Sequence, residues 1–294
     1  MVDVSVIVVA YNSERSIGAC LDSILRQKGA PFETIVIDNA SADDTLQKLR
    51  KERVSVIESK ENIGFGRACN LGFSQSEGKY ILFLNPDAEL VGEFALRDMC
   101  RHMEQNPHWG LAGTKVVSPE GCLESPPASE YPGQKHVSRE FSRLPGKIAW
   151  VIGASMVVRR DVFSRLSGFD PDYFLYSEET DLCLRTRTIG YEVGWMEDVV
   201  ARHIGGDSER DTDPFDVACR KLNGLLTFRS KHYSREECVF LANRDRRRAC
   251  LRMISNRIQA SFQGTKSKPW AKYRTYRGIW ETSTKYLDSN KVKP

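Results

Sequence analysis

The sequence predicts an α/β protein with a doubly wound, mainly parallel sheet, followed by a helical C-terminal extension. Two observations lead to this fold class. Continuous apolar runs rich in β-branched residues alternate with segments of helical periodicity, which is typical of βαβ units with right-handed connections. The last 65 of the 294 residues instead have a helical, amphipathic and strongly basic pattern. We expect a domain of residues 1–220 and an extension of residues 221–294.

The first βαβ unit is the clearest. Val4–Asn12 and Phe32–Ser41 are apolar runs that both end in polar turn residues, as strands covered on both faces do. Between them, apolar residues recur at helical spacing after Ser13, a plausible N-cap. They are Ile17, Leu21, Ile24 and Leu25.

The same alternation continues along the chain. Helices are expected over about 43–52, 64–74 and 95–105, with strands at 54–59, 80–84 and 110–117. Residues 118–145 are rich in Pro, Gly and Ser and predict a long surface loop of the kind that covers active sites. The segment 148–169 predicts a strand and a short helix, 177–190 a helix closed by Gly190, and 191–197 a strand.

Composition excludes several classes. The chain begins directly with an apolar run that lacks a basic n-region, and no stretch approaches 18 uninterrupted apolar residues, so we expect a cytoplasmic protein without a membrane span. The eight cysteines are never closer than 12 residues, which excludes CxxC zinc and redox motifs. We expect reduced, packed cysteines.

The net charge of +4 is unevenly distributed. Residues 230–294 hold 16 Lys or Arg against 5 Asp or Glu, a net +11, whereas the first 229 residues hold 27 against 34, a net −7. The basic extension can be a solvated helical face, an anchor to the anionic inner face of the cell membrane, or a homodimer contact. Nucleic-acid binding is not expected, because no stacking platform accompanies the basic residues.

Polar side chains follow the apolar runs where strands end. They are Asn12, Asp38, Asn39, Asn85 and Asp87, and an acidic cluster at 178–181 opens a helix. Asn85-Pro86-Asp87 alone is typical of a turn, since Pro86 cannot continue the ladder. However, the carboxyl ends of parallel strands share one edge of a sheet, where α/β proteins bind ligands. We therefore expect these groups to converge.

Six segments, in order over residues 3–206, resemble the nucleotide-sugar glycosyltransferases of family 2, which have the Rossmann-like GT-A fold. The last two together are the specific ones. The segments are VSVIVVAYN, VIDNASADDT, NIGFGRACNLGF, LFLNPDAEL, WVIGASMVVRRDVFSRLSGFDPDYFLYSEETDLCLR and ARHIGG. The Asn-Pro-Asp in place of the usual Asp-x-Asp, followed by GFDPDYFLYSEE, is similar to rhamnosyltransferases that build bacterial surface polysaccharides such as lipopolysaccharide.

The resemblance implies a divalent cation site. Asp87 would supply a hard oxygen ligand suited to Mg²⁺ or Mn²⁺, and the imidazole of His203 suits Mn²⁺ as a further ligand. His203 lies 24 residues after Glu179, the spacing at which the family carries a metal-binding histidine. Asn85 replaces the first acidic residue of the motif and brings no charge.

The resemblance also implies a donor site. Asp38 lies at the position of the base-recognising aspartate, which accepts the N3–H of uracil or thymine, and Ala10 and Tyr11 would lie beside the same base. Gly153 and Ala154 correspond to the small residues that let the backbone approach the donor sugar. Gly64-Phe65-Gly66 matches the first part of the G-x-G-x-x-G pattern, but the next glycine, Gly72, is too far along the chain to complete it. These glycines therefore do not indicate nicotinamide binding.

The family places its general base at the second acidic residue of a pair at a helix start, which is Glu179 here. Glu178 and Asp181 are the neighbouring alternatives, because carboxylates at a helix N-terminus also complement the macrodipole.

Together these features predict an inverting hexosyltransferase. We expect it to move L-rhamnose from dTDP-rhamnose to a glycan acceptor carried on a lipid. A UDP-sugar transferase of the same family is the nearest alternative. A Rossmann oxidoreductase and a non-catalytic sugar-nucleotide or polysaccharide binding module are the alternatives from other classes. The sequence does not identify the acceptor, the linkage or the oligomeric state.

Overall fold

The computed structural model describes residues 2–206, 209–210 and 212–290. It divides into two compact units. The first comprises the described residues within Met1–Tyr131, Phe141–Phe174 and Glu178–Ser208, and the second those within Pro132–Glu140, Leu175–Ser177 and Glu209–Pro294. Residues 291–294, the end of the predicted extension, lie outside the described part.

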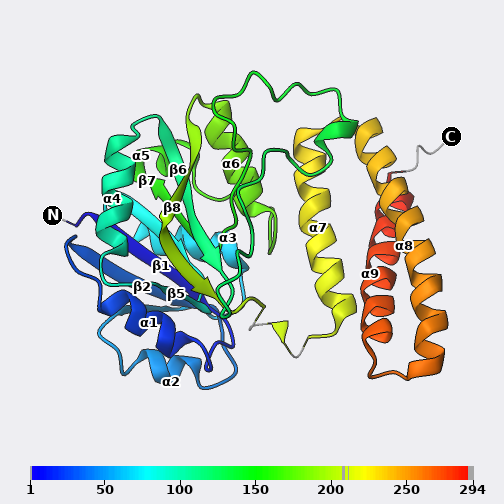
Figure 1. Ribbon diagram of the computed structural model, residues 1–294, viewed down its shortest axis with the longest axis horizontal. Helices are drawn as coiled ribbons and strands as arrows, with labels where there is room; N and C mark the ends of the chain where they lie inside the picture. Colours follow the sequence, from blue (N-terminus) through cyan, green and yellow to red (C-terminus); the bar gives the residue numbers. More distant parts are fainter. Residues whose placement is uncertain (1, 207–208, 211, 291–294) are drawn as a thin grey trace. The chain divides into compact units, whose positions relative to one another are not determined.

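The first unit is built on an eight-stranded sheet with the order β3-β2-β1-β4-β7-β6-β8-β5 (Figure 1). β1 pairs in parallel with β2 and β4, β2 with β3, and β6 with β8, whereas β7 and β5 run antiparallel to their neighbours. The strands are β1 (Val4–Ala10), β2 (Phe32–Asp38), β3 (Ser55–Glu58), β4 (Tyr80–Leu84), β5 (Ala88–Leu90), β6 (Trp109–Val117), β7 (Ser155–Arg159) and β8 (Glu192–His203).

Helices cover both faces of this sheet, as the continuous apolar runs predict. Alternate residues of β1 enter two different cores. Val6 and Val8 pack with α1 (Ile17–Leu25), α2 (Thr45–Leu49) and α4 (Ala95–Gln105). Ile7 and Val9 pack with α3 (Phe65–Ser74), α5 (Arg160–Arg165) and α6 (Glu178–Thr188). The predicted doubly wound, mainly parallel α/β fold is thus confirmed.

One expected segment needs correction. The strand predicted from residue 148 begins at Ser155, and before it Trp150 forms only an isolated bridge. The expected long loop of residues 118–145 is present and contains short ordered pieces: Val117 pairs with Leu123, Ala128 pairs with Trp150, and Gln134–His136 form a 3₁₀ turn, η1. Local pairing therefore fixes part of this loop.

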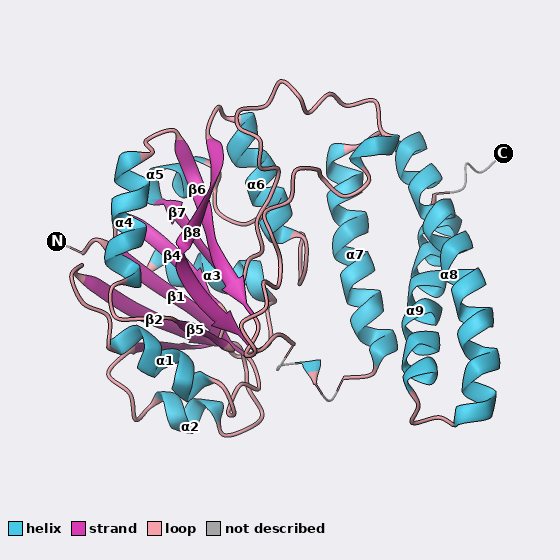
Figure 2. Cartoon of the chain, viewed as in Figure 1, coloured by secondary structure: helices cyan, strands magenta, loops and turns pink. Residues whose placement is uncertain are grey.

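The second unit is mainly helical (Figure 2). It contains α7 (Pro214–His232), α8 (Arg235–Gln263) and α9 (Lys268–Ser289), with α9 between α7 and α8. Its core includes Leu222, Leu226, Ala242 and Leu287. The expected domain boundary at residue 220 falls within α7. The last segment of the second unit begins at Glu209. Among the described helices, none is both long and apolar enough to cross a bilayer.

Candidate active site

The parallel pairing of β1, β2 and β4 aligns the ends of these strands. Ala10 lies opposite Asp38, the last residue of β2, and Val8 lies opposite Leu84, the last residue of β4. The polar residues that follow these strands are therefore brought to one sheet edge, where ligands bind in α/β proteins. This is the convergence that the sequence predicts.

Asp38 is almost fully buried at this edge. Its Oδ2 accepts a hydrogen bond from the Ser41 amide at 3.3 Å, but its Oδ1 is buried and has no hydrogen-bond partner among the described atoms. An unsatisfied buried acceptor is costly unless a ligand pairs with it. Ala10 is buried beside Asp38, and Tyr11 is half-buried at the start of the loop.

Asn85-Pro86-Asp87 forms the tight connection between β4 and β5. The Ala88 amide bonds to the Asn85 carbonyl at 3.1 Å, so the turn interpretation and a ligand role are compatible. β5 pairs antiparallel with β8, which places Ala88 opposite His203. This pairing brings His203 beside Asp87.

His203 lies between two carboxylates. Its Nε2 is 3.2 Å from Asp87 Oδ1 and 3.3 Å from Asn85 Nδ2, and its Nδ1 is 2.7 Å from Glu124 Oε2. Burial by itself would lower the pKa of His203, but the hydrogen bonds and charges of Asp87 and Glu124 outweigh it and raise the pKa to about 9. The imidazole is therefore a cation near neutral pH when no metal competes with its protons.

Glu124 is the residue of this site that sequence reasoning missed. It lies in the segment interpreted only as a surface loop, and no local pattern links it to His203. Its side chain is 26% exposed, against 9% for that of His203. Because the contact depends on a hairpin that returns the chain alongside β6, only the folded structure reveals it.

Gly153 and Ala154 lie directly before β7, and β7 pairs with β4. The Asn85 amide bonds to the Ala154 carbonyl at 2.9 Å. A Cβ added to Gly153 would lie 3.4 Å from Glu179 Cβ. The small residues, the Asn-Pro-Asp turn and the start of α6 are therefore close together.

The two glutamates that open α6 differ in burial. Glu178 is 5% exposed and its Oε2 has no hydrogen-bond partner among the described atoms, whereas Glu179 is half-buried. Desolvation, and then the charge of Glu179, raise the pKa of Glu178 well above its usual range. Burial therefore disfavours the charged form of Glu178, whereas Glu179 is less buried.

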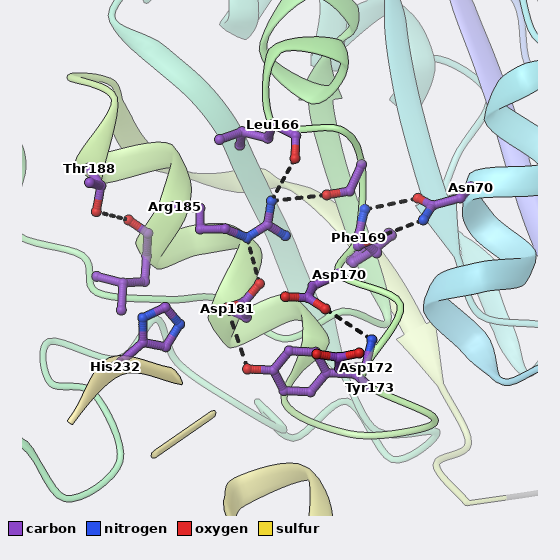
Figure 3. A network of polar contacts seen from close by, with 12 residues as sticks. Asn70, Leu166, Phe169, Asp170, Asp172, Tyr173, Asp181, Arg185, Thr188 and His232 are labelled. Atoms are coloured by element: carbon purple, nitrogen blue, oxygen red, sulfur yellow. Dashed lines mark hydrogen bonds and ion pairs between the residues drawn. The ribbon is translucent and has the colours of Figure 1, made fainter. Parts of the chain in front are cut away.

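Asp181 belongs to a structural network (Figure 3). Its Oδ2 accepts from Arg185 Nε at 2.6 Å and its Oδ1 from the Tyr173 hydroxyl at 3.4 Å. Arg185 Nη1 in turn donates to the carbonyls of Leu166 and Gly168, both at 3.0 Å. A 1% exposed carboxylate with these partners ties α6 to the loop that precedes it.

The model of the family described as Glycosyl transferase family 2 matches residues 5–167, which is more than half of the chain. The chain therefore belongs to this family, and the resemblance found in the sequence is confirmed. The fold and the site are thus those of a glycosyltransferase, the class that the family description gives.

Three relatives illustrate the range of the family. Hexosyltransferase Agl10 of low-salt glycan biosynthesis, from Haloferax volcanii, is 25% identical over 215 residues, which cover 68% of this chain and 67% of Agl10. N-acetylglucosaminyl-diphospho-decaprenol L-rhamnosyltransferase of Mycobacterium tuberculosis is 25% identical over 219 residues, covering 63% and 71%. Poly(ribitol-phosphate) beta-N-acetylglucosaminyltransferase TarS of Staphylococcus aureus is 27% identical over 187 residues, covering 61% of this chain but only 31% of TarS.

Solved structures share the fold. TarS 1–349 of S. aureus superposes with a TM-score of 0.58 at 18% identity, covering 98% of this chain and 92% of that one. Mannosyltransferase PcManGT of Pyrobaculum calidifontis, in complex with GDP-Man and Mn²⁺, gives a TM-score of 0.58 at 17% identity, covering 98% and 88%. These similarities confirm the predicted GT-A fold.

The raised pKa of His203 predicts how the stability of the metal-free protein depends on pH. Below about pH 6.5 both the folded and the unfolded protein carry the proton, so the ion pairs contribute fully. As the pH rises through about 9, this contribution is lost, at up to about 1.4 kcal/mol per pH unit. Urea unfolding in EDTA at pH 6 to 9 gives the free energy of unfolding of both proteins. We expect the free energy of unfolding of wild type to exceed that of His203→Gln by a difference that becomes smaller as the pH rises. A margin that stays constant would contradict the assignment.

Proposed function

We propose that this chain is an inverting glycosyltransferase that moves a hexose, with L-rhamnose from dTDP-rhamnose as the favoured donor, to a lipid-linked glycan in bacterial surface polysaccharide synthesis. The observation that carries the proposal is the pairing of Asp87 Oδ1 with His203 Nε2 at 3.2 Å, three residues after the end of β4, which pairs with β1. A carboxylate and an imidazole so placed suit a nucleoside diphosphate with its cation.

The distance between these atoms fits a divalent cation. Asp87 Oδ1 and His203 Nε2 are 3.2 Å apart, close enough for both groups to bind one Mg²⁺ or Mn²⁺ ion. The Asn85 amide is 3.3 Å from the same imidazole nitrogen, and a half-turn would bring its oxygen there instead. Mg²⁺ or Mn²⁺ bound here would neutralise charge on the departing diphosphate.

The described residues contain no group of three His, Cys, Asp or Glu side chains arranged to hold a metal by themselves. This is compatible with the proposal, since ions of this class commonly bind through one or two protein groups together with substrate phosphates. Asp87 and His203 are the residues that would hold the cation.

The remaining roles follow from burial and charge. The free Oδ1 of Asp38 can accept the N3–H of thymine or uracil. Glu179 can take the proton of the acceptor hydroxyl as that oxygen attacks the anomeric carbon from the face opposite the diphosphate, and a single displacement inverts the configuration. Glu178, held neutral by burial, is poorly suited to accept that proton.

Thermal-shift measurements with a panel of nucleotide sugars test the donor. We expect dTDP-rhamnose with Mn²⁺ to raise the Tm more than UDP-GlcNAc or GDP-mannose, since binding to the folded state alone stabilises it. The M. tuberculosis relative named a rhamnosyltransferase supports this choice, while TarS, solved with UDP-GlcNAc, supports the alternative of a UDP-sugar. Asp87→Ala should remove the Mn²⁺-dependent part of the shift. A shift restricted to UDP-sugars would overturn the donor assignment.

The general base can be tested by a matched pair of substitutions. We expect Glu179→Gln to lower turnover by about 10²-fold or more, the usual contribution of a general base, with donor affinity nearly unchanged. Glu178→Gln should have a much smaller effect, because it replaces a neutral acid with a neutral amide of the same shape. Steady-state kinetics with titrated donor separate the two. If Glu178→Gln abolished turnover and Glu179→Gln did not, Glu178 would be the base.

Association with the inner face of the cell membrane would occur through α8. Four large apolar side chains lie on one side of this helix and are more than half exposed: Leu251, Ile254, Ile258 and Phe262. Arg252 and Arg257 lie among them in the sequence, and Arg247 and Arg248 lie just before them. An apolar stripe within a basic helix is complementary to an anionic lipid surface.

Vesicle co-sedimentation tests this surface. We expect the double variant Leu251→Glu with Ile258→Glu to bind anionic vesicles at least tenfold more weakly, because burial of each leucine or isoleucine side chain contributes about 1.5–3 kcal/mol. Leu25→Glu, on an exposed residue of α1, is the control and should bind like wild type. Binding unaffected by both salt and the double substitution would exclude the proposed surface.

A further inference from the structure

We propose that Glu124 is a positioning residue for the cation site: it holds the Nδ1–H of His203, so that Nε2 is the nitrogen presented, together with Asp87, to the metal. This inference rests on the proposed function, because it concerns the same cation. Glu124 itself would touch neither the cation nor the substrate.

The geometry around the imidazole supports this role. Glu124 Oε2 lies 2.7 Å from Nδ1, whereas Asp87 Oδ1 lies 3.2 Å from Nε2. The two carboxylates therefore use different ring nitrogens. A neutral imidazole has one N–H and one lone pair, and a hydrogen bond that holds the proton on one nitrogen leaves the lone pair on the other. In the neutral ring, this arrangement would leave the lone pair at Nε2, on the side of Asp87 and Asn85.

A carboxylate is a suitable hydrogen-bond acceptor for the Nδ1–H of a metal-binding histidine. Histidine ligands in metalloproteins generally donate their second N–H to a carboxylate or carbonyl, which fixes the ring and makes the ligating nitrogen more basic. Glu124 cannot join Asp87 on the same cation from its present place, because it contacts the opposite ring nitrogen.

The backbone holds Glu124 in place. β6 lies alongside β8, with Val117 opposite Arg202, and a hairpin at residues 118–122 turns the chain back so that the Glu124 amide bonds to the Val116 carbonyl at 3.0 Å. This alignment brings Glu124 to the end of β8, next to His203.

The chain after β8 leaves room for the carboxylate. Gly205 has φ +76°, and a Cβ at this position would lie 3.0 Å from Glu124 Oε1. A side chain there would be strained in its backbone and would crowd the carboxylate. The fit is thus specific to a glycine that follows the histidine by two residues.

Mn²⁺ binding in the presence of UDP tests the proposal without requiring turnover. The EPR signal of free Mn²⁺ measures how much of the ion is bound. We expect Glu124→Ala to weaken Mn²⁺ binding by about 10- to 100-fold, the usual effect of losing such a partner. Glu124→Gln should weaken Mn²⁺ binding less than Glu124→Ala does, because its amide oxygen still accepts a hydrogen bond from Nδ1–H of His203. Glu120→Gln is the matched control in the same hairpin and should match wild type, since the Glu120 carboxylate accepts a hydrogen bond from the Ser118 hydroxyl at 2.7 Å and not from His203.

A second measurement reports the proton directly. ¹⁵N NMR of histidine-labelled protein with Mg²⁺ and UDP should show His203 protonated at Nδ1 in wild type and in Glu124→Gln. Glu124→Ala should show a mixture of both ring forms. Because Glu124→Gln keeps the shape of the side chain, it remains informative if Glu124→Ala does not fold.

The possible results distinguish the role of Glu124 from the existence of the cation site. If Asp87→Ala weakens Mn²⁺ binding but Glu124→Ala and Glu124→Gln bind Mn²⁺ like wild type, the role of Glu124 is overturned while the cation site stands. If Asp87→Ala also binds like wild type, the cation site itself is overturned. If wild-type His203 carries its proton at Nε2 with Mg²⁺ present, Glu124 does not set the ring form.

Discussion

The candidate site depends on the short antiparallel pairing between β5 and β8. β5 has only three residues, yet it places Ala88 opposite His203 and so brings Asp87 and the imidazole together from distant parts of the sequence. Side chains alternate between the two faces of a strand, so a slip of one residue in this pairing would turn the imidazole to the other face. The parallel pairing of β6 with β8 constrains the same strand from its other side and carries the hairpin that contains Glu124. The chemistry at His203 is therefore a consequence of strand register.

Burial gives three acidic residues at the start of α6 different properties. Glu178 is enclosed without a compensating partner for one oxygen, which favours its neutral form. Asp181 is equally buried but is paired with Arg185, so its charge holds the preceding loop in place. Glu179 is half-buried and lies close to Gly153, where an added Cβ would be 3.4 Å from Glu179 Cβ. The family resemblance singles out Glu179 as the candidate base, and the surroundings of the three side chains show which of them is instead a paired structural carboxylate.

The sequence predicts the regular part of this protein well because periodicity directly reflects burial. β1, β2 and β4 are apolar runs covered on both faces, and α4 spans Ala95–Gln105, where its pattern predicts it. It does not reveal β5, since three residues after a proline carry no periodic signal, nor the link between Glu124 and His203, which is a contact through space. The polar strand ends were recognisable for the same reason as the strands, whereas the roles within the acidic cluster needed the fold.

The C-terminal helices illustrate a different limit of periodicity. An apolar stripe on a helix usually marks the face that packs against its neighbours. In α8 the packed face instead includes small residues such as Ala242, Ala249 and Ala260, and the large apolar residues Leu251 and Ile258 face outward. Small residues allow α8 and α9 to approach closely, and the larger side chains remain more than half exposed. A second copy covering them would bring two segments of net charge +11 together, which like-charge repulsion opposes. An anionic lipid surface would attract the same charges, and this asymmetry favours a membrane over a homodimer as the partner of α8.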